Sequence, residues 1–406
     1  MKLISGRPYW PDHSGPVPRY PPLREHTACD VAVVGGGFSG ALIAYTLRAA
    51  GMDVLLVDRR DIGMGSTAAS TALIEYQLDA ELREFIRLAG QAAAVRSYRL
   101  SRNAVWELER VVRGLGDRCE WQRRIGLHLA SGPAAVPGLK EEVATRAAAG
   151  FAVEFLTSSA LERRFGVRAP AALLYPDAAQ VNPFRLTHAL VRSAQGDGLR
   201  AYGRTQITRF QSRRGGVVLT NDRGCRIVAR RAVLAAGYES LTSLPRGLAK
   251  LVSTFALVTQ PVADPPPGLA QCLFTETADP YVYARTTADG RVMIGGEDED
   301  FTHPATRTRH LSAKTRTLLR KFRRWFPQVS LRATTRWAGT FASTADGLGY
   351  VDTTPRYRQA IFAIGVGGNG MISSVIAARL IRDQFLGKKT PDAALFRFDR
   401  PGSRHR

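Results

Sequence analysis

The chain has 406 residues, of which 45% are apolar and 23% charged, a composition that excludes a disordered chain, a collagen and a small disulfide scaffold. Lysine and arginine total 57 against 35 aspartate and glutamate, so the formal net charge is +22, and all but seven of the basic residues are arginines. Such a surplus suits acidic partners such as nucleic acid or lipid headgroups. The arginines are scattered without a tract of five or more, which favours charge spread over the surface.

The cysteines do not form a metal or disulfide pattern. Cys29, Cys119, Cys225 and Cys272 are far apart and include no CxxC pair, so no metal site is expected. The N-terminus has no apolar core typical of a secretory signal, which predicts a cytoplasmic protein. The longest uncharged stretch, between Arg358 and Arg379, is broken by glycines in its middle, and we expect no transmembrane segment.

The first ordered unit is a strand, a glycine turn, a helix and a second strand. Residues 1–28 are rich in proline and predict an extended tail laid over the surface. The apolar run 30–34 then leads into a glycine turn and the helix-favouring stretch 38–50, and the apolar run 54–57 ends at Asp58. This order predicts a βαβ unit of about thirty residues.

The glycine turn of this unit has the spacing of a dinucleotide-binding motif. Gly35 permits a tight turn, Gly37 lets backbone approach the pyrophosphate, and Gly40 lets the helix pack on the strand. Phe38 and Ser39 open the helix, whose N-terminus favours phosphate. Asp58, at the end of the second strand, would accept hydrogen bonds from ribose hydroxyls and repel a 2′-phosphate, despite Arg59 and Arg60.

Two further segments favour FAD over NAD. Gly65, Ser66 and Thr67 follow the second strand, where small hydroxyl residues would face the pyrophosphate and ribityl chain. Far along the chain, the apolar run 361–364 leads into a second glycine turn and a helix. That helix can point its dipole at the pyrimidine end of a flavin. The residues of this turn are Gly365, Gly367, Gly368, Asn369, Gly370 and Met371.

A β-hairpin in the mostly β region 250–300 provides the substrate-binding candidates. The runs 281–285 and 291–296 flank the turn signal Asp289-Gly290. Alternation places Tyr281, Tyr283 and Arg285 on one strand face, where an arginine between phenols could clamp a carboxylate. A strand face with packed tyrosines is the alternative interpretation. The acidic run 297–300 could attract a cationic amine or be a solvated loop.

The predicted helix 311–326 is the basis for an alternative function, the binding or modification of RNA. Leu318, Phe322 and Trp325 form an apolar stripe beside a basic face, as in helices that lie on membranes or nucleic acid. A basic flavoprotein that binds or modifies RNA is therefore the alternative to an enzyme of small molecules. A stripe that faces the core, with a solvated basic back, explains the same pattern.

Residues 29–400 resemble the D-amino-acid-oxidase-like FAD-dependent oxidoreductases, in the branch of γ-glutamylputrescine, glycine and sarcosine oxidases. The matching pieces, in family order, are 33–40, 65–67, 180–183, 233–237, 345–347 and 365–371. The resemblance implies an α/β fold with a Rossmann-like FAD-binding domain and an interleaved β-rich substrate domain, and further FAD contacts at Gly237 and Gly339. It implies hydride transfer from the carbon beside an amine nitrogen of a small-molecule amine or amino acid, with an imine as product, and O2 or another carrier as electron acceptor.

The resemblance also implies domain boundaries. We expect residues 29–90, 155–245 and 335–406 to form the FAD-binding domain and residues 91–154 and 246–334 the substrate domain. Tyr283 and Arg285 are the substrate-binding and catalytic candidates.

Three departures from the family's pattern have consequences. Met293 stands where we would place the lysine that activates oxygen in sarcosine-oxidase-type members, which puts O2 as acceptor in doubt. Ala68 and Ala69 replace a histidine that attaches FAD covalently in some relatives, and no cysteine lies near Asp346, so non-covalent FAD is predicted. Ala72 replaces a polar residue of some relatives, so substrate contacts could differ.

Overall fold

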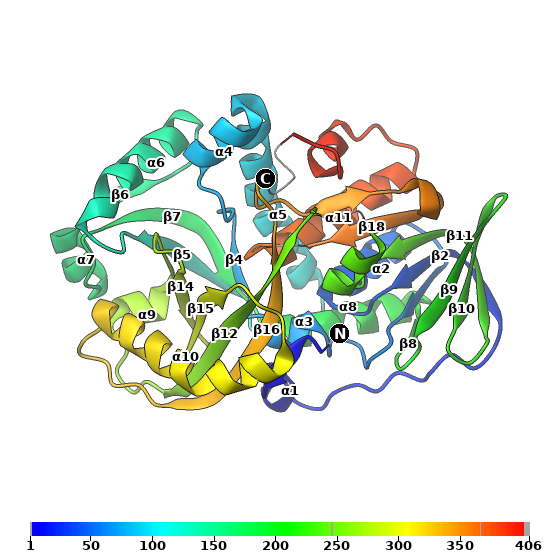
Figure 1. The fold of residues 1–406 in the computed structure, drawn as a ribbon, viewed down its shortest axis with the longest axis horizontal. Helices are drawn as coiled ribbons and strands as arrows, with labels where there is room; N and C mark the ends of the chain where they lie inside the picture. Colours follow the sequence, from blue (N-terminus) through cyan, green and yellow to red (C-terminus); the bar gives the residue numbers. More distant parts are fainter. Residues whose placement is uncertain (1, 245–246, 366, 402–406) are drawn as a thin grey trace.

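The computed structural model describes residues 2–244, 247–365 and 367–401, and the last residues of the expected C-terminal segment, 402–406, lie outside it. Two large β-sheets lie side by side, each covered by helices (Figure 1). The chain crosses between the two sheets several times, so each half of the molecule is built from segments that are far apart in the sequence. This agrees with the α/β architecture expected from the sequence.

The first sheet has eight strands, in the order β17-β18-β11-β2-β3-β8, with β10 beside β11 and β9 beside β10. The pairs from β18 through β11, β2 and β3 to β8 are parallel. Continuous apolar runs suit such strands because helices bury both faces of a parallel sheet. The bounds are β2 (Thr27–Val34), β3 (Val54–Val57), β8 (Arg200–Tyr202), β9 (Ile207–Arg213), β10 (Gly216–Asn221), β11 (Arg226–Leu234), β17 (Tyr350–Asp352) and β18 (Ala360–Ile364).

Three helices cover this Rossmann-like sheet: α2 (Phe38–Ala49), α8 (Pro183–Gly196) and α11 (Gly370–Phe385). Asn182 caps α8, because its side chain accepts the N–H of Arg185 at 3.0 Å and Pro183 occupies the first helical position. The two glycine turns expected from the sequence connect β2 to α2 and β18 to α11, so each leads from a strand of this sheet into a helix that packs on it.

The second sheet has ten strands, in the order β1-β16-β12-β15-β14-β13-β5-β7-β4, with β6 beside β7. Its predicted hairpin is confirmed, since β14 and β15 pair antiparallel with Ala284 opposite Ile294. The bounds are β1 (Ile4–Gly6), β4 (Leu73–Glu75), β5 (Gln122–Leu129), β6 (Glu154–Thr157), β7 (Ala171–Gln180), β12 (Lys250–Pro261), β13 (Cys272–Glu276), β14 (Val282–Thr286), β15 (Arg291–Glu299) and β16 (Ala333–Ser343).

The remaining helices lie mostly around this second sheet. They are α1 (Trp10–His13), α3 (Ser66–Ala69), α4 (Leu82–Ala89), α5 (Gln91–Gly114), α6 (Val136–Ala148), α7 (Ser158–Phe165), α9 (Pro267–Gln271) and α10 (Pro304–Trp325), with 3-10 turns η1 (Pro133–Ala135), η2 (Gly237–Ser243), η3 (Pro355–Tyr357) and η4 (Pro391–Phe396). Across the described ranges, none of the helices is long and apolar enough to span a membrane.

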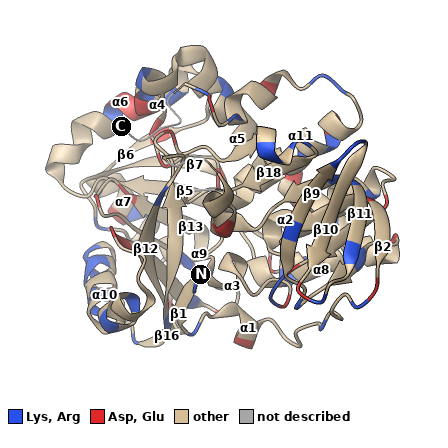
Figure 2. Cartoon of the chain, turned by 45° about the vertical axis from the view of Figure 1, so that its right-hand side comes forward, with Lys and Arg blue, Asp and Glu red and all other residues tan. Residues whose placement is uncertain are grey.

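The amphipathic pattern of the basic helix is explained by core packing. Leu318, Phe322 and Trp325 of α10 are at most 3% exposed and pack in the core beneath the ten-stranded sheet. Figure 2 shows Lys and Arg positions along the length of α10. Lys314 and Lys321 of this helix form ion pairs with Glu297. The apolar stripe of α10 therefore faces the core, which agrees with the interpretation of a core-facing stripe with a solvated basic back.

The N-terminal segment differs from the surface tail that the sequence predicts. Strand β1 pairs antiparallel with β16, and Trp10 is 1% exposed, with its indole N–H donating to the carbonyl of Ser70 at 2.7 Å. Burial of a large aromatic ring offsets the poor strand propensity of this proline-rich stretch. Tyr9 and Trp10 are thus part of the core between the two sheets, whereas Gly6 and Arg7 are exposed.

The sheet memberships differ from the expected domain boundaries in three places. Strand β4, strands β6 and β7, and most of β16 belong to the ten-stranded sheet, although we expected all of them in the FAD-binding domain. Alternation of apolar residues predicts that a segment is a strand, but it carries no information about which of two sheets the strand joins.

Candidate functional site

A single large cavity of about 1300 Å³ runs between the two sheets. Its lining comes from the glycine turns of the Rossmann-like sheet at one end and from β4, β13 and the β14 hairpin at the other. We call these the cofactor end and the substrate end. Of the cofactor-binding residues predicted from the sequence, all line the cavity except Gly40 and Asn369.

The first glycine turn is shaped by contacts that leave no room for side chains. Gly35 has φ +113°, and a Cβ on it would collide with the carbonyl of Ala235. A Cβ on Gly40 would overlap the carbonyl oxygen of Gly35, so Gly40 brings α2 against the turn although it does not touch the cavity. Phe38 N–H donates to Thr67 Oγ1 at 2.9 Å, and the N-cap residue, Gly37, provides no side-chain cap. This end of α2 fits a pyrophosphate.

The end of β3 provides the expected carboxylate. Asp58 Oδ2 accepts the N–H of Gly36 at 2.6 Å, and Oδ1 accepts the N–H of Arg60 at 2.7 Å. Burial raises the pKa of Asp58. Arg59 and Arg60 both pair with Glu239, which lines the same end of the cavity. Two carboxylates at this place suit ribose hydroxyl groups and oppose a 2′-phosphate.

The second glycine turn closes the cofactor end at the start of α11. Gly367 has φ +69°, and Gly368 N–H donates to Asp79 Oδ1 at 2.9 Å. Asn369 is 2% exposed, and its Nδ2 donates to the carbonyl of Gln77, so it fixes the turn instead of lining the cavity. With Gly237 and Gly339 also in the lining, the turns form a cradle that fits FAD.

Tyr281 and Tyr283 line the substrate end, as the hairpin alternation predicts. Their ring centroids are 5.8 Å apart, and the rings are tilted by 38°. Gly295, opposite Tyr283 on β15, makes this arrangement possible, because a Cβ on it would collide with the Tyr283 phenol. The strand pair thus needs a glycine where the tyrosine ring crosses it.

Arg285 does not line the cavity, and its predicted role as a carboxylate clamp is wrong. Its side chain is buried away from the cavity, with Nε donating to the carbonyl of Thr71 at 2.5 Å and Nη2 to the carbonyl of Val181 at 3.0 Å. The guanidinium also lies 5.1 Å from the ring centroid of Trp10. The N-terminal segment covers this part of the strand face, which the hairpin sequence alone cannot show.

Two carboxylates that the sequence analysis missed line the substrate end. Burial raises the pKa of Glu75 to about 7 and that of Asp79 to about 6. Glu75 accepts the hydroxyl of Tyr175, and Asp79 exposes its side chain into the cavity. The alternation of Glu75, Gln77 and Asp79 soon after Gly65–Thr67 was the signal that could have indicated them.

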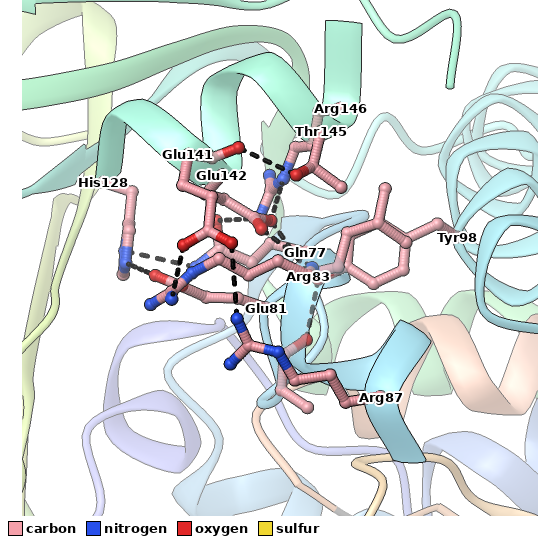
Figure 3. Close-up of polar contacts among 12 residues, drawn as sticks. Gln77, Glu81, Arg83, Arg87, Tyr98, His128, Glu141, Glu142, Thr145 and Arg146 are labelled. Carbon is pink, nitrogen blue, oxygen red and sulfur yellow. Dashed lines mark hydrogen bonds and ion pairs between the residues drawn. The ribbon is translucent and has the colours of Figure 1, made fainter. Parts of the chain in front are cut away.

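We call Glu75 and Asp79 the acidic wall. A polar network lies behind this acidic wall (Figure 3). Gln77 Nε2 lies 3.1 Å from Nδ1 of His128, and His128 Nε2 lies 3.4 Å from Glu81 Oε1. Behind them, Arg146 Nε donates to Glu142 Oε1 at 2.6 Å, and both of these side chains are 0% exposed. The wall is therefore held by side chains from β5, from α6 and from the segment between β4 and α4.

Met293 is fully buried and does not line the cavity. It packs with Trp10 and Trp337 between the sheets. Among the described residues that line the cavity there is no lysine.

Comparisons with known proteins agree with this geometry. Gamma-glutamylputrescine oxidoreductase of Escherichia coli (strain K12) is 25% identical over 384 residues, which cover 90% of this chain and 85% of that protein. Glycine oxidase of Geobacillus kaustophilus is 25% identical over 372 residues, which cover 89% of this chain and 94% of that protein. Its crystal structure superposes with a TM-score of 0.76 at 22% identity and covers 92% of this chain and 99% of the other.

A proline dehydrogenase has the same fold. The crystal structure of L-proline dehydrogenase from P. horikoshii superposes with a TM-score of 0.75 at 18% identity, covering 93% of this chain and 98% of the other. The sequence model of the DAO family, described as FAD dependent oxidoreductase, matches residues 30–384. The chain therefore belongs to the DAO family of FAD-dependent oxidoreductases.

Proposed function

We propose that the enzyme oxidises the C–N bond of an amine or amino acid to an imine, which water then hydrolyses. The supporting observation is the continuous cavity that joins the two glycine turns to Tyr281, Tyr283 and the carboxylates Glu75 and Asp79. Bound FAD would supply the acceptor for the hydride that leaves the carbon beside the nitrogen. The protein's own residues then need only to hold, orient and desolvate the amine.

The residues of the substrate end suit these tasks. An amine enters as an ammonium ion at neutral pH, and Glu75 and Asp79 can accept its N–H groups. One N–H proton has to pass to a carboxylate or to water before the hydride can leave the carbon. Tyr283 lies in the same lining and would orient the substrate by its ring face and hydroxyl. We assign Tyr283 a substrate-positioning role on this basis.

Non-covalent FAD is part of the proposal. Ala68 and Ala69 offer no nucleophile for covalent attachment. The four cysteines are all free, and none belongs to the described lining of the cavity. Acid precipitation of the purified protein should therefore release all of the yellow colour into the supernatant.

Anaerobic addition of amines and amino acids to the purified holoenzyme tests the reaction. We expect at least one of them to bleach the visible flavin absorbance, with one equivalent of imine-derived carbonyl compound formed per FAD reduced. Reoxidation should be followed with O2 and with a dye, because no lysine is found among the described lining residues. A panel in which nothing bleaches the flavin would contradict the proposed function.

The pKa values of Glu75 and Asp79 predict a pH profile. Both are raised by burial, so both groups are ionised only above about pH 6 to 7, and the two titrate as a coupled pair. Because an ammonium substrate needs both ionised forms, kcat/KM is expected to rise by up to about a hundredfold per pH unit below pH 6, where both groups titrate, and more slowly towards pH 7. Steady-state kinetics from pH 5 to 8 checks this, with Asp79→Asn expected to flatten the slope. A flat profile in the unmodified enzyme would exclude these carboxylates from substrate binding.

A further inference from the structure

The substrate end of the cavity is dominated by carboxylates. Its lining carries only two basic side chains in the described residues, Arg83 and His128. The acidic residues in this part of the lining are Glu75, Asp79, Glu81, Glu84 and Asp279. A cavity of one charge sign with low-dielectric walls concentrates ligands of the opposite sign.

Both basic side chains are already occupied by carboxylates of the protein. Arg83 Nε donates to Glu81 Oε2 at 2.7 Å, and Arg83 Nη1 lies 3.3 Å from Glu141 Oε2. His128 Nε2 faces the other oxygen of Glu81 at 3.4 Å. Arg285, which could have bound a substrate carboxylate, donates to backbone carbonyls outside the cavity. A carboxylate on the substrate would therefore meet acids and no uncommitted cation along the described lining of this end.

Glu75 and Asp79, in contrast, have hydrogen-bonding capacity left. Asp79 accepts a single backbone N–H, that of Gly368, and exposes the rest of its side chain into the cavity. Glu75 accepts one hydrogen bond, from the hydroxyl of Tyr175, through Oε2. The negative charge at this end is therefore incompletely compensated by the protein.

Aromatic rings complete the surroundings of these acids. Tyr238, Tyr281 and Tyr283 line the same cavity. Burial raises the pKa of Tyr238 and Tyr283 to about 12, so their rings stay neutral at physiological pH. Neutral tyrosine faces attract ammonium groups through the cation–π interaction, most strongly where water is excluded. Carboxylates and aromatic faces are together the chemistry that recognises organic cations.

We propose that the preferred substrate is an amine with a second positive charge, of the diamine or polyamine class, in place of an amino acid. The acidic wall would hold the second ammonium group, whereas the carboxylate of an amino acid would need a basic residue at this place. This inference rests on the proposed oxidation of a C–N bond and adds the class of amine that is oxidised.

A matched substrate series tests the inference on the holoenzyme. Anaerobic flavin reduction is measured with α,ω-diamines, unbranched monoamines and ω-amino acids of three to six carbons. We expect the ratio of the flavin-reduction rate constant to the substrate dissociation constant to be at least about tenfold higher for the best diamine than for the monoamine of equal length, with the amino acid lowest. Equal or better reduction by the amino acids, or by conventional α-amino acids, would overturn the inference and leave the proposed function standing. Absence of reduction by every amine and amino acid would contradict the proposed function itself.

Two neutral variants separate a binding role from a structural one. Asp79→Asn and Glu75→Gln keep the size and one acceptor oxygen of each side chain while they remove the charge. In at least one of them, the preference for the diamine over the monoamine should fall about tenfold or more. FAD content and the thermal unfolding midpoint show whether each variant is folded. Asp264→Asn, an exposed carboxylate outside the cavity, is the control and should keep the preference unchanged. Full retention of the preference in both cavity variants would overturn the inference.

Discussion

Replacing Gly40 with alanine is expected to weaken FAD binding about 10- to 100-fold and to destabilise the protein. The new Cβ would overlap the carbonyl oxygen of Gly35, which is backbone and cannot rotate away as a side chain would. Gly35 itself is held at φ +113° against Ala235, so the turn has little freedom to retreat. Overpacking of this kind costs about 1–3 kcal/mol in unfolding free energy. Each 1.4 kcal/mol lost from the cofactor cradle is about tenfold in affinity.

The matched control is Gly114→Ala. Gly114 is the last residue of α5, and an added Cβ there would meet nothing within 4 Å. Alanine favours helix over glycine by about 1 kcal/mol in a helix interior and by less at an end, so this variant should keep its FAD and its stability. The ratio of flavin to protein absorbance, titration of the apoprotein with FAD and thermal unfolding measure both effects. Full FAD content and an unchanged unfolding midpoint in Gly40→Ala would contradict the prediction, because the turn would then accommodate the Cβ without loss of stability or of FAD affinity.

The cofactor end could be predicted from the sequence because its chemistry lies in short contiguous segments. A strand, a glycine turn and a helix follow one another within residues 30–50, and spacing alone fixes which glycines face the phosphate and which face the strand. The same local logic applies to β18 and α11. The geometry of such a turn depends mainly on residues that are neighbours in the sequence.

The substrate end could not be predicted in the same way, because distant segments decide which side chains reach the cavity. Alternation correctly placed Tyr283 and Arg285 on one strand face, but the buried Trp10 from the N-terminal segment covers the arginine. Asp79 becomes a cavity residue where β4 and the turn before α11 meet, through the hydrogen bond from Gly368. Contacts across hundreds of residues follow from sheet order, about which one sequence carries little information.

The buried ion pair behind the acidic wall is expected to be the most sensitive point of the fold. Arg146 and Glu142 are both 0% exposed, and the guanidinium of Arg146 lies 5.3 Å from the ring centroid of Tyr98 and 5.6 Å from that of Tyr76. In Arg146→Met, Glu142 would remain as an uncompensated buried carboxylate. Removing one partner of such a pair costs about 3–5 kcal/mol, so the urea midpoint of unfolding should fall markedly.

The partner's further contacts decide how much a second substitution restores. Glu142 also accepts the backbone N–H groups of Leu82 and Arg83, at 2.8 and 3.0 Å, and so caps the start of α4 (Figure 3). The double variant Arg146→Met with Glu142→Gln has no unpaired buried charge, and the amide oxygen of the glutamine can still cap the helix. About 0.5–3 kcal/mol of the lost unfolding free energy should therefore be regained.

Arg99→Met is the matched control for the pair, because Arg99 is exposed on α5 and donates only to the carbonyl of Ala149, at 3.1 Å, among the hydrogen bonds of the described residues. Its substitution should change stability by less than about 0.5 kcal/mol. If Arg146→Met proves as stable as Arg99→Met, the ion pair does not hold the wall. The orientation of Gln77, whose Oε1 accepts from Arg146 at 3.2 Å, would then have to come from His128 alone.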